Sequence, residues 1–223
     1  MRVSQNFLIA TAVGLAAAGF AFFAQAGTNE TSLTSGAETP SQADAVFAGG
    51  CFWCTEADFD KVDGVLETIS GYTGGHVNNP SYSDVTRGTS GHYEAVRVIY
   101  DPGVVSYDDL VEYYWRTVDP LDANGQFCDR GSSYRTAIFV ETPEEREVAE
   151  ASKAALDEGG TLASPIVTEI IEQDTFWPAE DYHQNYYKNN RRQYDFYRFR
   201  CGRDQRIDQV WADTPPLEND LTH

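Results

Sequence analysis

The chain has 223 residues, 41% hydrophobic and 13% aromatic, enough to bury one core but with little room beyond a single domain and its tails. The formal net charge is −19, so the long-range field of the protein would repel nucleic acid and anionic membranes. We therefore expect a monomer that binds neither.

The first 26 residues differ from the rest of the chain. Arg2 gives a weakly positive start, residues 7–24 are almost wholly apolar, and Ala24-Gln25-Ala26 offers a small-residue cleavage site. This pattern predicts a signal peptide over residues 1–26, and hence a periplasmic or secreted protein. The alternative is an uncleaved membrane anchor formed by residues 7–24, because this run approaches the length of a bilayer span.

Three segments follow the predicted signal peptide. Residues 27–43 are rich in Gly, Ser and Thr with almost no bulky apolar side chains, so we expect a disordered linker. Residues 44–212 are expected to form the catalytic domain, and residues 213–223 a flexible tail.

Hydrophobic patterning predicts six elements between residues 44 and 140. In chain order they are a strand at 44–48, a helix at 52–62, strands at 65–72 and 93–100, a helix at 106–118 and a strand at 134–140. This order is that of the split βαβ pattern. We expect an α+β fold, a ferredoxin-like βαββαβ two-layer sandwich with helices on one face of a mixed sheet.

Local signals support individual elements and extend the prediction toward the C-terminus. Strict alternation over residues 93–100 places Glu94 on the more apolar face of its strand. Ser106 can cap the following helix, and Thr142-Pro143-Glu144-Glu145 predicts a capped helix start. The remaining expectations are a helix to about residue 157, a strand at 165–172, a helix at 179–188, and a long polar loop at 76–91 of the kind that carries function.

Cys51 is the candidate nucleophile. It follows Gly49-Gly50 and precedes a predicted helix, so unpaired backbone amides and the helix dipole favour an anion at its sulfur, and we expect a thiolate. The alternative is a buried, inert cysteine.

Four cysteines in an exported chain would ordinarily indicate two structural disulfides. Cys51 and Cys54 lie too close in sequence to close a stabilising loop, and a Cys-x-x-Cys pair at a helix start favours redox exchange. Cys128, beside the acidic Asp129, should have a less reactive thiol and is interpreted as structural.

The residues around Cys51 suggest a small reactive pocket. Phe52 and Trp53 cannot both face the same core, so one of them is expected to wall a pocket, although both could be packing residues. Burial of Glu94 would raise its pKa and make it a proton donor, whereas a solvated surface glutamate is the alternative. Tyr82, Asp129 and Tyr134 are ambiguous when each is taken alone.

An ordered series of motifs resembles the peptide methionine sulfoxide reductase A family over about residues 45 to 211. The motifs are Gly49-Gly50-Cys51-Phe52-Trp53, Gly71-Tyr72-Thr73-Gly74-Gly75, Tyr82, Gly91-His92-Tyr93-Glu94, Asp119-Pro120, Gly131-Ser132-Ser133-Tyr134-Arg135 and Glu180-Asp181-Tyr182-His183-Gln184. The resemblance implies reduction of methionine S-sulfoxide, free or in proteins, without a cofactor. It also implies an external dithiol reductant, which we expect to be a thioredoxin-like protein.

The resemblance implies a role for each site residue. Cys51 would attack the sulfoxide sulfur and become a sulfenic acid, which a second thiol can convert to a disulfide. Phe52 and Trp53 would hold the methyl group, and Glu94 would protonate the oxygen. The remaining implied contacts are hydrogen bonds from Tyr82 and Tyr134 to that oxygen, and an ordering role in the pocket for Asp129.

The resolving cysteine is less settled, because this chain departs from the commonest family pattern. Cys54 replaces a frequent glycine, and Cys128 stands in a segment where Gly-Asn-Asp is frequent. We favour Cys54 as the first resolver by proximity. Cys201, in the basic tail segment Arg200-Cys201-Gly202-Arg203, which we expect to be flexible, would then act as a relay.

Two other classes of protein stay open from the residues alone. Cys51-x-x-Cys54 also suits a thioredoxin-like disulfide oxidoreductase, although the aromatic spacers would block a protein disulfide. A metal-binding module could use the cysteines or three histidines, His76, His92 and His183, but a closed zinc site would need unusual spacing, and we expect no metal. His183 is interpreted as a helix residue that supports the fold, with direct proton transfer as the alternative.

Overall fold

The computed structural model describes residues 41–217 and 221–222. The predicted signal peptide and nearly all of the predicted linker therefore lie outside the described residues. Within the described part, no helix combines the length and the apolar character that a membrane span requires. Near the C-terminus, the Asp63 N–H donates to the carbonyl of Leu221, which attaches this part of the predicted tail to the domain.

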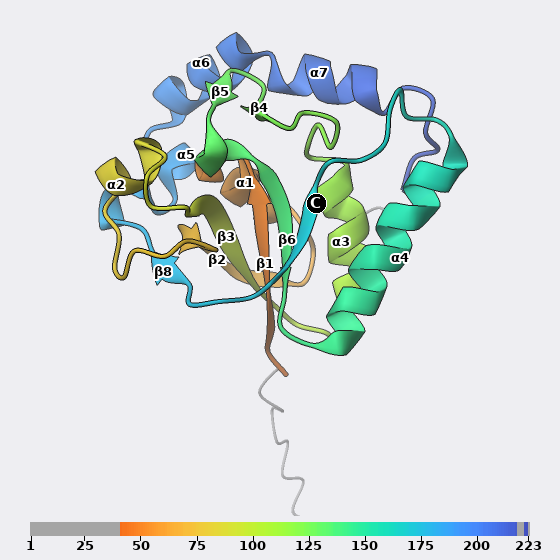
Figure 1. Ribbon diagram of the computed structural model, residues 1–223, viewed down its shortest axis with the longest axis horizontal. Helices are drawn as coiled ribbons and strands as arrows, with labels where there is room; N and C mark the ends of the chain where they lie inside the picture. Colours follow the sequence, from red (N-terminus) through yellow and green to blue (C-terminus); the bar gives the residue numbers. More distant parts are fainter. Residues whose placement is uncertain (1–40, 218–220, 223) are drawn as a thin grey trace, which may run out of the picture. The chain divides into compact units, whose positions relative to one another are not determined.

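A six-stranded sheet forms the centre of the domain, in the order β7-β6-β1-β3-β2-β8 (Figure 1). Neighbouring strands are antiparallel except β6 and β7, which are parallel. The strands are β1 (Ala43–Gly49), β2 (Val65–Thr73), β3 (Tyr93–Tyr100), β6 (Thr136–Val140), β7 (Glu169–Glu172) and β8 (Trp177–Pro178). A separate hairpin pairs β4 (Gly125–Gln126) with β5 (Asp129–Arg130). The α+β class is confirmed.

Seven α-helices lie among the described residues. They are α1 (Phe52–Phe59), α2 (Tyr82–Thr86), α3 (Tyr107–Trp115), α4 (Pro143–Gly159), α5 (Tyr186–Asn189), α6 (Arg191–Cys201) and α7 (Arg203–Val210). The predicted caps of two are present: Ser106 and Thr142 accept hydrogen bonds from the amides of Asp109 and Glu145. Both caps follow from local sequence, which explains why these helix starts were predictable.

Three predicted segments differ in the structure. The loop expected at 76–91 contains α2, because Ser81 and Asp84 form a capping box. The helix expected at 179–188 is divided into a 3₁₀ turn, Asp181–His183, and the short α5, because Asn185 adopts a left-handed conformation with φ of 51°. The basic segment around Cys201 is not a flexible tail, since it forms the junction of α6 and α7.

Side chains on the two faces of the sheet pack into different clusters. On β1, Ala45 and Phe47 join the main core, which also contains buried residues of α1, α3 and α4. The alternate residues Val46 and Ala48 face the other side, where Phe176, from the segment before β8, packs on them together with Phe139 of β6. Successive side chains of β1 point to opposite faces of the sheet, and both faces are buried. This burial accounts for the nearly continuous apolar sequence of β1.

Candidate active site

The turn between β1 and α1 delivers Cys51 to the start of a helix. Gly50 has φ of +84°, and a Cβ at this position would lie 2.5 Å from Cβ of Gln126, so only glycine fits. Cys51 is the N-cap residue of α1, and it is 6% exposed. The predicted position of the nucleophile at a helix N-terminus is therefore present.

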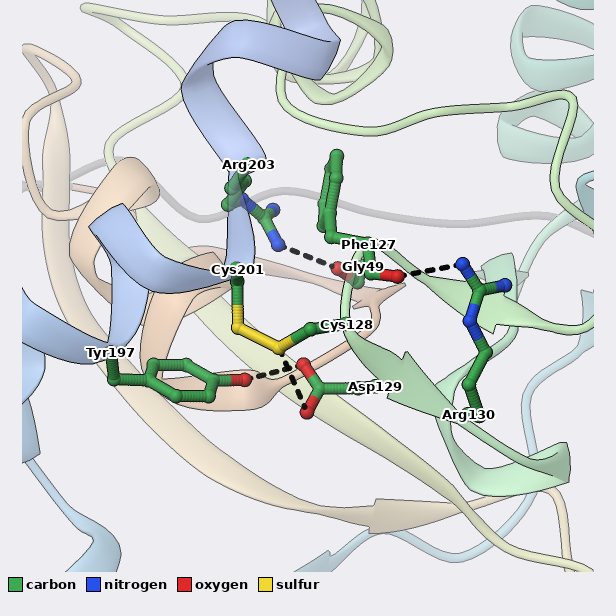
Figure 2. Close-up of a disulfide and its surroundings, with 8 residues drawn as sticks. All are labelled: Gly49, Phe127, Cys128, Asp129, Arg130, Tyr197, Cys201 and Arg203. Atoms are coloured by element: carbon green, nitrogen blue, oxygen red, sulfur yellow. Dashed lines mark hydrogen bonds between the residues drawn. A yellow bond between two sulfur atoms is a disulfide. The ribbon is translucent and has the colours of Figure 1, made fainter.

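A buried arginine from α7 supports this turn. The guanidinium of Arg203 donates to the carbonyl of Gly49 at 3.2 Å (Figure 2). It also donates to the carbonyl of Thr117 at 2.7 Å, and the residue is 1% exposed. The guanidinium carbon of Arg203 also lies over the ring of Phe127, 4.6 Å from the ring centroid. The last helix thus fixes the backbone immediately before the nucleophile.

A small cavity of about 70 Å³ opens at Cys51. It is lined by Cys51, Phe52, Trp53, Tyr82, Glu94, Asp129, Tyr134 and Tyr197. These include every residue that the sequence analysis assigned to catalysis or substrate binding. Cys54 and Cys201, the two candidate resolvers, do not line it, and Tyr197 is a wall residue that the sequence analysis missed.

Glu94 is held in a form that can donate a proton. The Phe52 N–H donates to Glu94 Oε2 at 3.1 Å, and a weaker hydrogen bond with the Tyr134 hydroxyl also acts on the carboxyl, whose buried Oε1 has no partner of full hydrogen-bond geometry among the described residues. Burial raises the pKa of Glu94 to about 8, despite the hydrogen bond from Phe52. Near neutral pH the carboxyl is therefore mostly protonated, and the unpaired oxygen is the one free to carry the proton.

The polar wall opposite the aromatic residues is a chain of hydroxyls and one carboxyl. The hydroxyls of Tyr82 and Tyr134 are hydrogen-bonded to each other, and burial raises the pKa of Tyr82 to about 12. The Tyr197 hydroxyl donates to Asp129 Oδ2. Burial also raises the pKa of Asp129 above its usual value. All three tyrosines thus stay protonated. The Tyr197 hydroxyl already donates to Asp129, so Tyr82 and Tyr134 supply the hydroxyls that can turn to donate to an oxygen in the cavity.

The two buried thiols behave as a pair. Burial raises the pKa of Cys51 well above its usual value, and its hydrogen bond to Cys54 raises it further. That same hydrogen bond, with the positive charges of Arg203 and Arg198, lowers the pKa of Cys54 despite its burial. The lowered pKa expected for Cys51 is therefore not found: burial outweighs the helix terminus, and Cys54 is the more acidic thiol of the two.

Cys128 and Cys201 form a disulfide, with their Cα atoms 4.8 Å apart (Figure 2). Cys51 and Cys54 are free cysteines. Cys128, interpreted as structural, is thus covalently paired, and Cys201 is not a free thiol. The sulfurs of these cysteines and a carboxylate oxygen of Asp129 also make the one group of potential metal ligands found among the described residues, within 4.8 Å of one another. With the two sulfurs bonded to each other, this group offers no thiolate ligand.

Residues of the Glu180–Gln184 motif support the walls of the cavity through hydrogen bonds. The two carboxylate oxygens of Glu180 accept hydrogen bonds from the Tyr82 N–H and the Tyr72 hydroxyl, at 2.9 Å and 2.8 Å. His183 accepts from the Trp53 indole, and Gln184 bonds to both the N–H and the carbonyl of Ser70. The fold-supporting interpretation of His183 therefore agrees with its contacts, which also reach a wall of the cavity.

A much larger cavity, of about 960 Å³, lies between α3, α4 and the segment from Thr214 to Leu217. Its lining is mainly apolar and contains no cysteine or histidine. This larger cavity would be chosen on volume alone, but it has no thiol nucleophile. The small cavity at Cys51 is therefore the candidate active site.

Comparison with known proteins agrees with this site. Residues 43–215 match the family model described as peptide methionine sulfoxide reductase. The chain belongs to this family. Peptide methionine sulfoxide reductase MsrA of Listeria monocytogenes serotype 4b (strain CLIP80459) is 53% identical over 167 residues, which are 75% of this chain and 94% of that protein. This chain is therefore an oxidoreductase of the MsrA type.

Other relatives extend the likeness to longer proteins and to solved structures. A Vibrio cholerae MsrA/MsrB protein is 44% identical over 198 residues, 89% of this chain and 52% of that protein. Methionine sulfoxide reductase A of Corynebacterium diphtheriae superposes with a TM-score of 0.61 at 32% identity, covering 69% of this chain and 77% of that one. The reduced form of Mxr1 from Saccharomyces cerevisiae gives 0.62 at 29% identity, covering 67% and 86%. The family model spans every residue that lines the cavity at Cys51.

Proposed function

We propose that this chain reduces methionine S-sulfoxide, free or in proteins, to methionine, with Cys51 as the nucleophile. The observation that carries the proposal is the cavity of about 70 Å³, in which the Cys51 thiol, an aromatic wall and the protonated Glu94 meet. A cavity of this size suits a methyl sulfoxide group rather than a whole side chain. The membership of the family and its MsrA relatives support the same activity.

Substrate binding would use the two kinds of wall differently. Phe52 and Trp53 would bury the methyl group, because aromatic rings give apolar contact and favourable sulfur–aromatic interaction. The sulfoxide oxygen would accept hydrogen bonds from Tyr82 and Tyr134. Glu94 would then donate its carboxyl proton to that oxygen.

The first chemical step transfers the oxygen. Cys51 sulfur attacks the sulfoxide sulfur, its thiol proton passes to the hydrogen-bonded Cys54 thiolate, and Glu94 protonates the oxygen. The attack forms a transient bond between the Cys51 and methionine sulfurs. As the protonated oxygen moves to the Cys51 sulfur, this bond and the sulfur–oxygen bond of the sulfoxide both break, and Cys51 is left as a sulfenic acid. Methionine is released two electrons more reduced, and Cys51 is oxidised by the same two electrons.

Cys54 is the proposed first resolver. Its thiol attacks the sulfenic sulfur of Cys51, the hydroxyl leaves with the Cys54 proton as water, and a Cys51–Cys54 disulfide forms. The hydrogen bond between the two side chains supports this choice. The relay proposed for Cys201 requires that the Cys128–Cys201 disulfide be reduced first, because a sulfur in a disulfide is not a nucleophile.

An external dithiol of the thioredoxin-like class would return the enzyme to its reduced form. Its two thiols become a disulfide as Cys51 and Cys54 become thiols again, so no cofactor is needed. We place this cycle in an exported, monomeric protein, following the predicted signal peptide. We also describe the central framework as ferredoxin-like, because its four long strands lie in the order β6-β1-β3-β2 with two helical crossovers.

The test is methionine formation from each sulfoxide epimer with a dithiol reductant. Wild type should consume the S-epimer alone, and Cys51→Ser should form no methionine. Cys54→Ser should transfer oxygen more slowly, because it lacks the proton acceptor for the Cys51 thiol, and it should stop after one methionine per enzyme, because it also lacks the resolving thiol. Full turnover by Cys51→Ser, or insulin reduction that does not depend on methionine sulfoxide, would contradict the proposal.

A further inference from the structure

We infer that the Cys128–Cys201 disulfide positions the wall of the cavity formed by Asp129 and Tyr197, and that it stays closed during turnover. The inference rests on the proposed function, because that wall is assigned to the methionine sulfoxide pocket. It gives the second pair of cysteines a task separate from the exchange at Cys51 and Cys54.

Each cysteine of the disulfide lies close in sequence to one of the two wall residues. Cys128 directly precedes Asp129 in the hairpin, and Cys201 lies four residues after Tyr197, which puts both on the same side of α6. Between the two elements, the Tyr197 hydroxyl donates to Asp129 (Figure 2). The disulfide and this hydrogen bond are therefore adjacent links between the hairpin and the helix.

The hairpin is anchored to the rest of the domain at Gln126, whose side chain bonds to the N–H and the carbonyl of Asp119, but few contacts hold its β5 side against α6. Its strands β4 and β5 have two residues each, and a two-stranded hairpin is only marginally stable in water. Arg130 bonds to Asp122 and to the Phe127 carbonyl, both within the same loop, so neither contact attaches the loop to α6. A covalent bond across 73 residues of sequence supplies that attachment and the Phe127–Arg203 stack reinforces it.

The surroundings of the two cysteine pairs separate their tasks. Cys51 and Cys54 are 6% and 2% exposed, whereas Cys128 is exposed at the tip of the hairpin. The hydrogen bonds of Cys51 and Glu94 do not involve Cys128 or Cys201, so opening the disulfide leaves these contacts in place. It frees the hairpin to move Asp129 away from Tyr197, so the loss falls on substrate binding rather than on oxygen transfer.

Single-turnover kinetics test the inference, because one turnover needs no recycling and a relay cannot contribute to it. Cys128→Ser, Cys201→Ser and Tyr197→Phe are each reduced at Cys51 and Cys54 and mixed with a methionine S-sulfoxide peptide. We expect each variant to raise the half-saturating concentration by about tenfold and to change the maximal rate by less than about twofold. Tyr197→Phe keeps the disulfide, so it serves if the serine variants fail to fold. Asp195→Asn, an exposed change on the same helix, is the matched control and should behave as wild type.

A double variant shows whether the disulfide acts through the hydrogen bond. The double variant Cys128→Ser, Tyr197→Phe should have a half-saturating concentration no higher than that of the single variant that binds less tightly. Both changes release the same wall, so their effects should not add. Three results would each overturn the inference. The first is a double variant whose rise in half-saturating concentration equals the product of the two single rises. The others are a Cys128→Ser variant with an unchanged half-saturating concentration, and a Cys201→Ser defect that appears only over several turnovers. A wild type that forms no methionine would instead contradict the proposed function.

Differential alkylation tests that the bond stays closed. After several turnovers with a thioredoxin-like reductant, Cys51 and Cys54 should be labelled as thiols, and Cys128 and Cys201 should be recovered as one linked peptide pair. Alkylated Cys201 in the working wild-type enzyme would overturn this part of the inference.

Discussion

The indole N–H of Trp53 donates a hydrogen bond to Nδ1 of His183 at 3.1 Å, across 130 residues of sequence. An indole nitrogen can only donate, so Nδ1 must be the acceptor and the proton of the neutral imidazole lies on Nε2. Burial lowers the pKa of His183, and the residue is 1% exposed, which keeps it neutral. His183 is therefore a positioning residue for one aromatic wall of the cavity.

Replacing His183 tests this relationship. His183→Phe keeps a ring but removes the acceptor, so we expect a KM about tenfold higher with a smaller change in kcat, since the indole wall is no longer fixed. His183→Asn retains an acceptor and should recover part of the loss. Steady-state kinetics and tryptophan fluorescence measure the two effects, and equal behaviour of Phe and Asn would show that the hydrogen bond is not the cause.

The pH dependence of oxygen transfer should follow Glu94. Its pKa of about 8 means that the proton it donates is present below that pH and is lost as the pH rises through it. The single-turnover rate should therefore fall above about pH 8 in wild type. Glu94→Gln should be slower but flat over this range, and Glu94→Ala should lose roughly 100-fold or more, because it can neither donate a proton nor a hydrogen bond.

A second buried carboxyl, Glu56 on α1, should make stability depend on pH. Burial raises its pKa to about 7, despite the hydrogen bond from the Asn185 N–H. The folded state thus keeps a proton that the unfolded chain loses near pH 4.5, so the contribution of Glu56 to stability declines between about pH 4.5 and 7. The decline amounts to roughly 3 kcal/mol for this shift. Glu56→Gln should reduce the difference in Tm between pH 5 and pH 8, and an unchanged difference would contradict the assignment.

Replacing Arg203 should lower the free energy of unfolding more than replacing any other cationic side chain. Its substitution by Met leaves the carbonyls of Gly49 and Thr117 without their donor and leaves Asp58, 3.6 Å from Arg203, with one fewer cation. We expect a loss of roughly 3–5 kcal/mol in the free energy of unfolding, the range for breaking a buried ionic contact. Arg200→Met, at an exposed position nearby, is the control and should change stability little. Urea unfolding of both variants gives the comparison.

Most of the site could be predicted because its residues lie in short motifs with local signals. Gly49-Gly50 before Cys51 indicated a tight turn into a helix, and the alternation of β3 placed Glu94 on a buried face. The capped starts of α3 and α4 were predictable for the same reason. In each case the decisive interaction spans only a few residues.

The missed features depend on contacts between distant segments. No local pattern pairs Cys128 with Cys201, and α6 has an unremarkable polar sequence apart from its aromatic residues, so Tyr197 could not be assigned to the cavity. The protonation of Cys51 was misjudged because burial, which only the folded chain determines, outweighs the helix terminus. The break at Asn185 likewise depends on the bond from its N–H to Glu56.

The buried contact of Arg203 also bears on the order in which the protein can mature. β1 and the turn to Cys51 are synthesised well before α7, which supplies Arg203 from 154 residues further along the chain. Until then the carbonyls of Gly49 and Thr117 have no guanidinium to bind. A nascent chain that ends before α7 can therefore form the sheet yet lack a finished nucleophile turn, which couples the onset of activity to the later synthesis of α7.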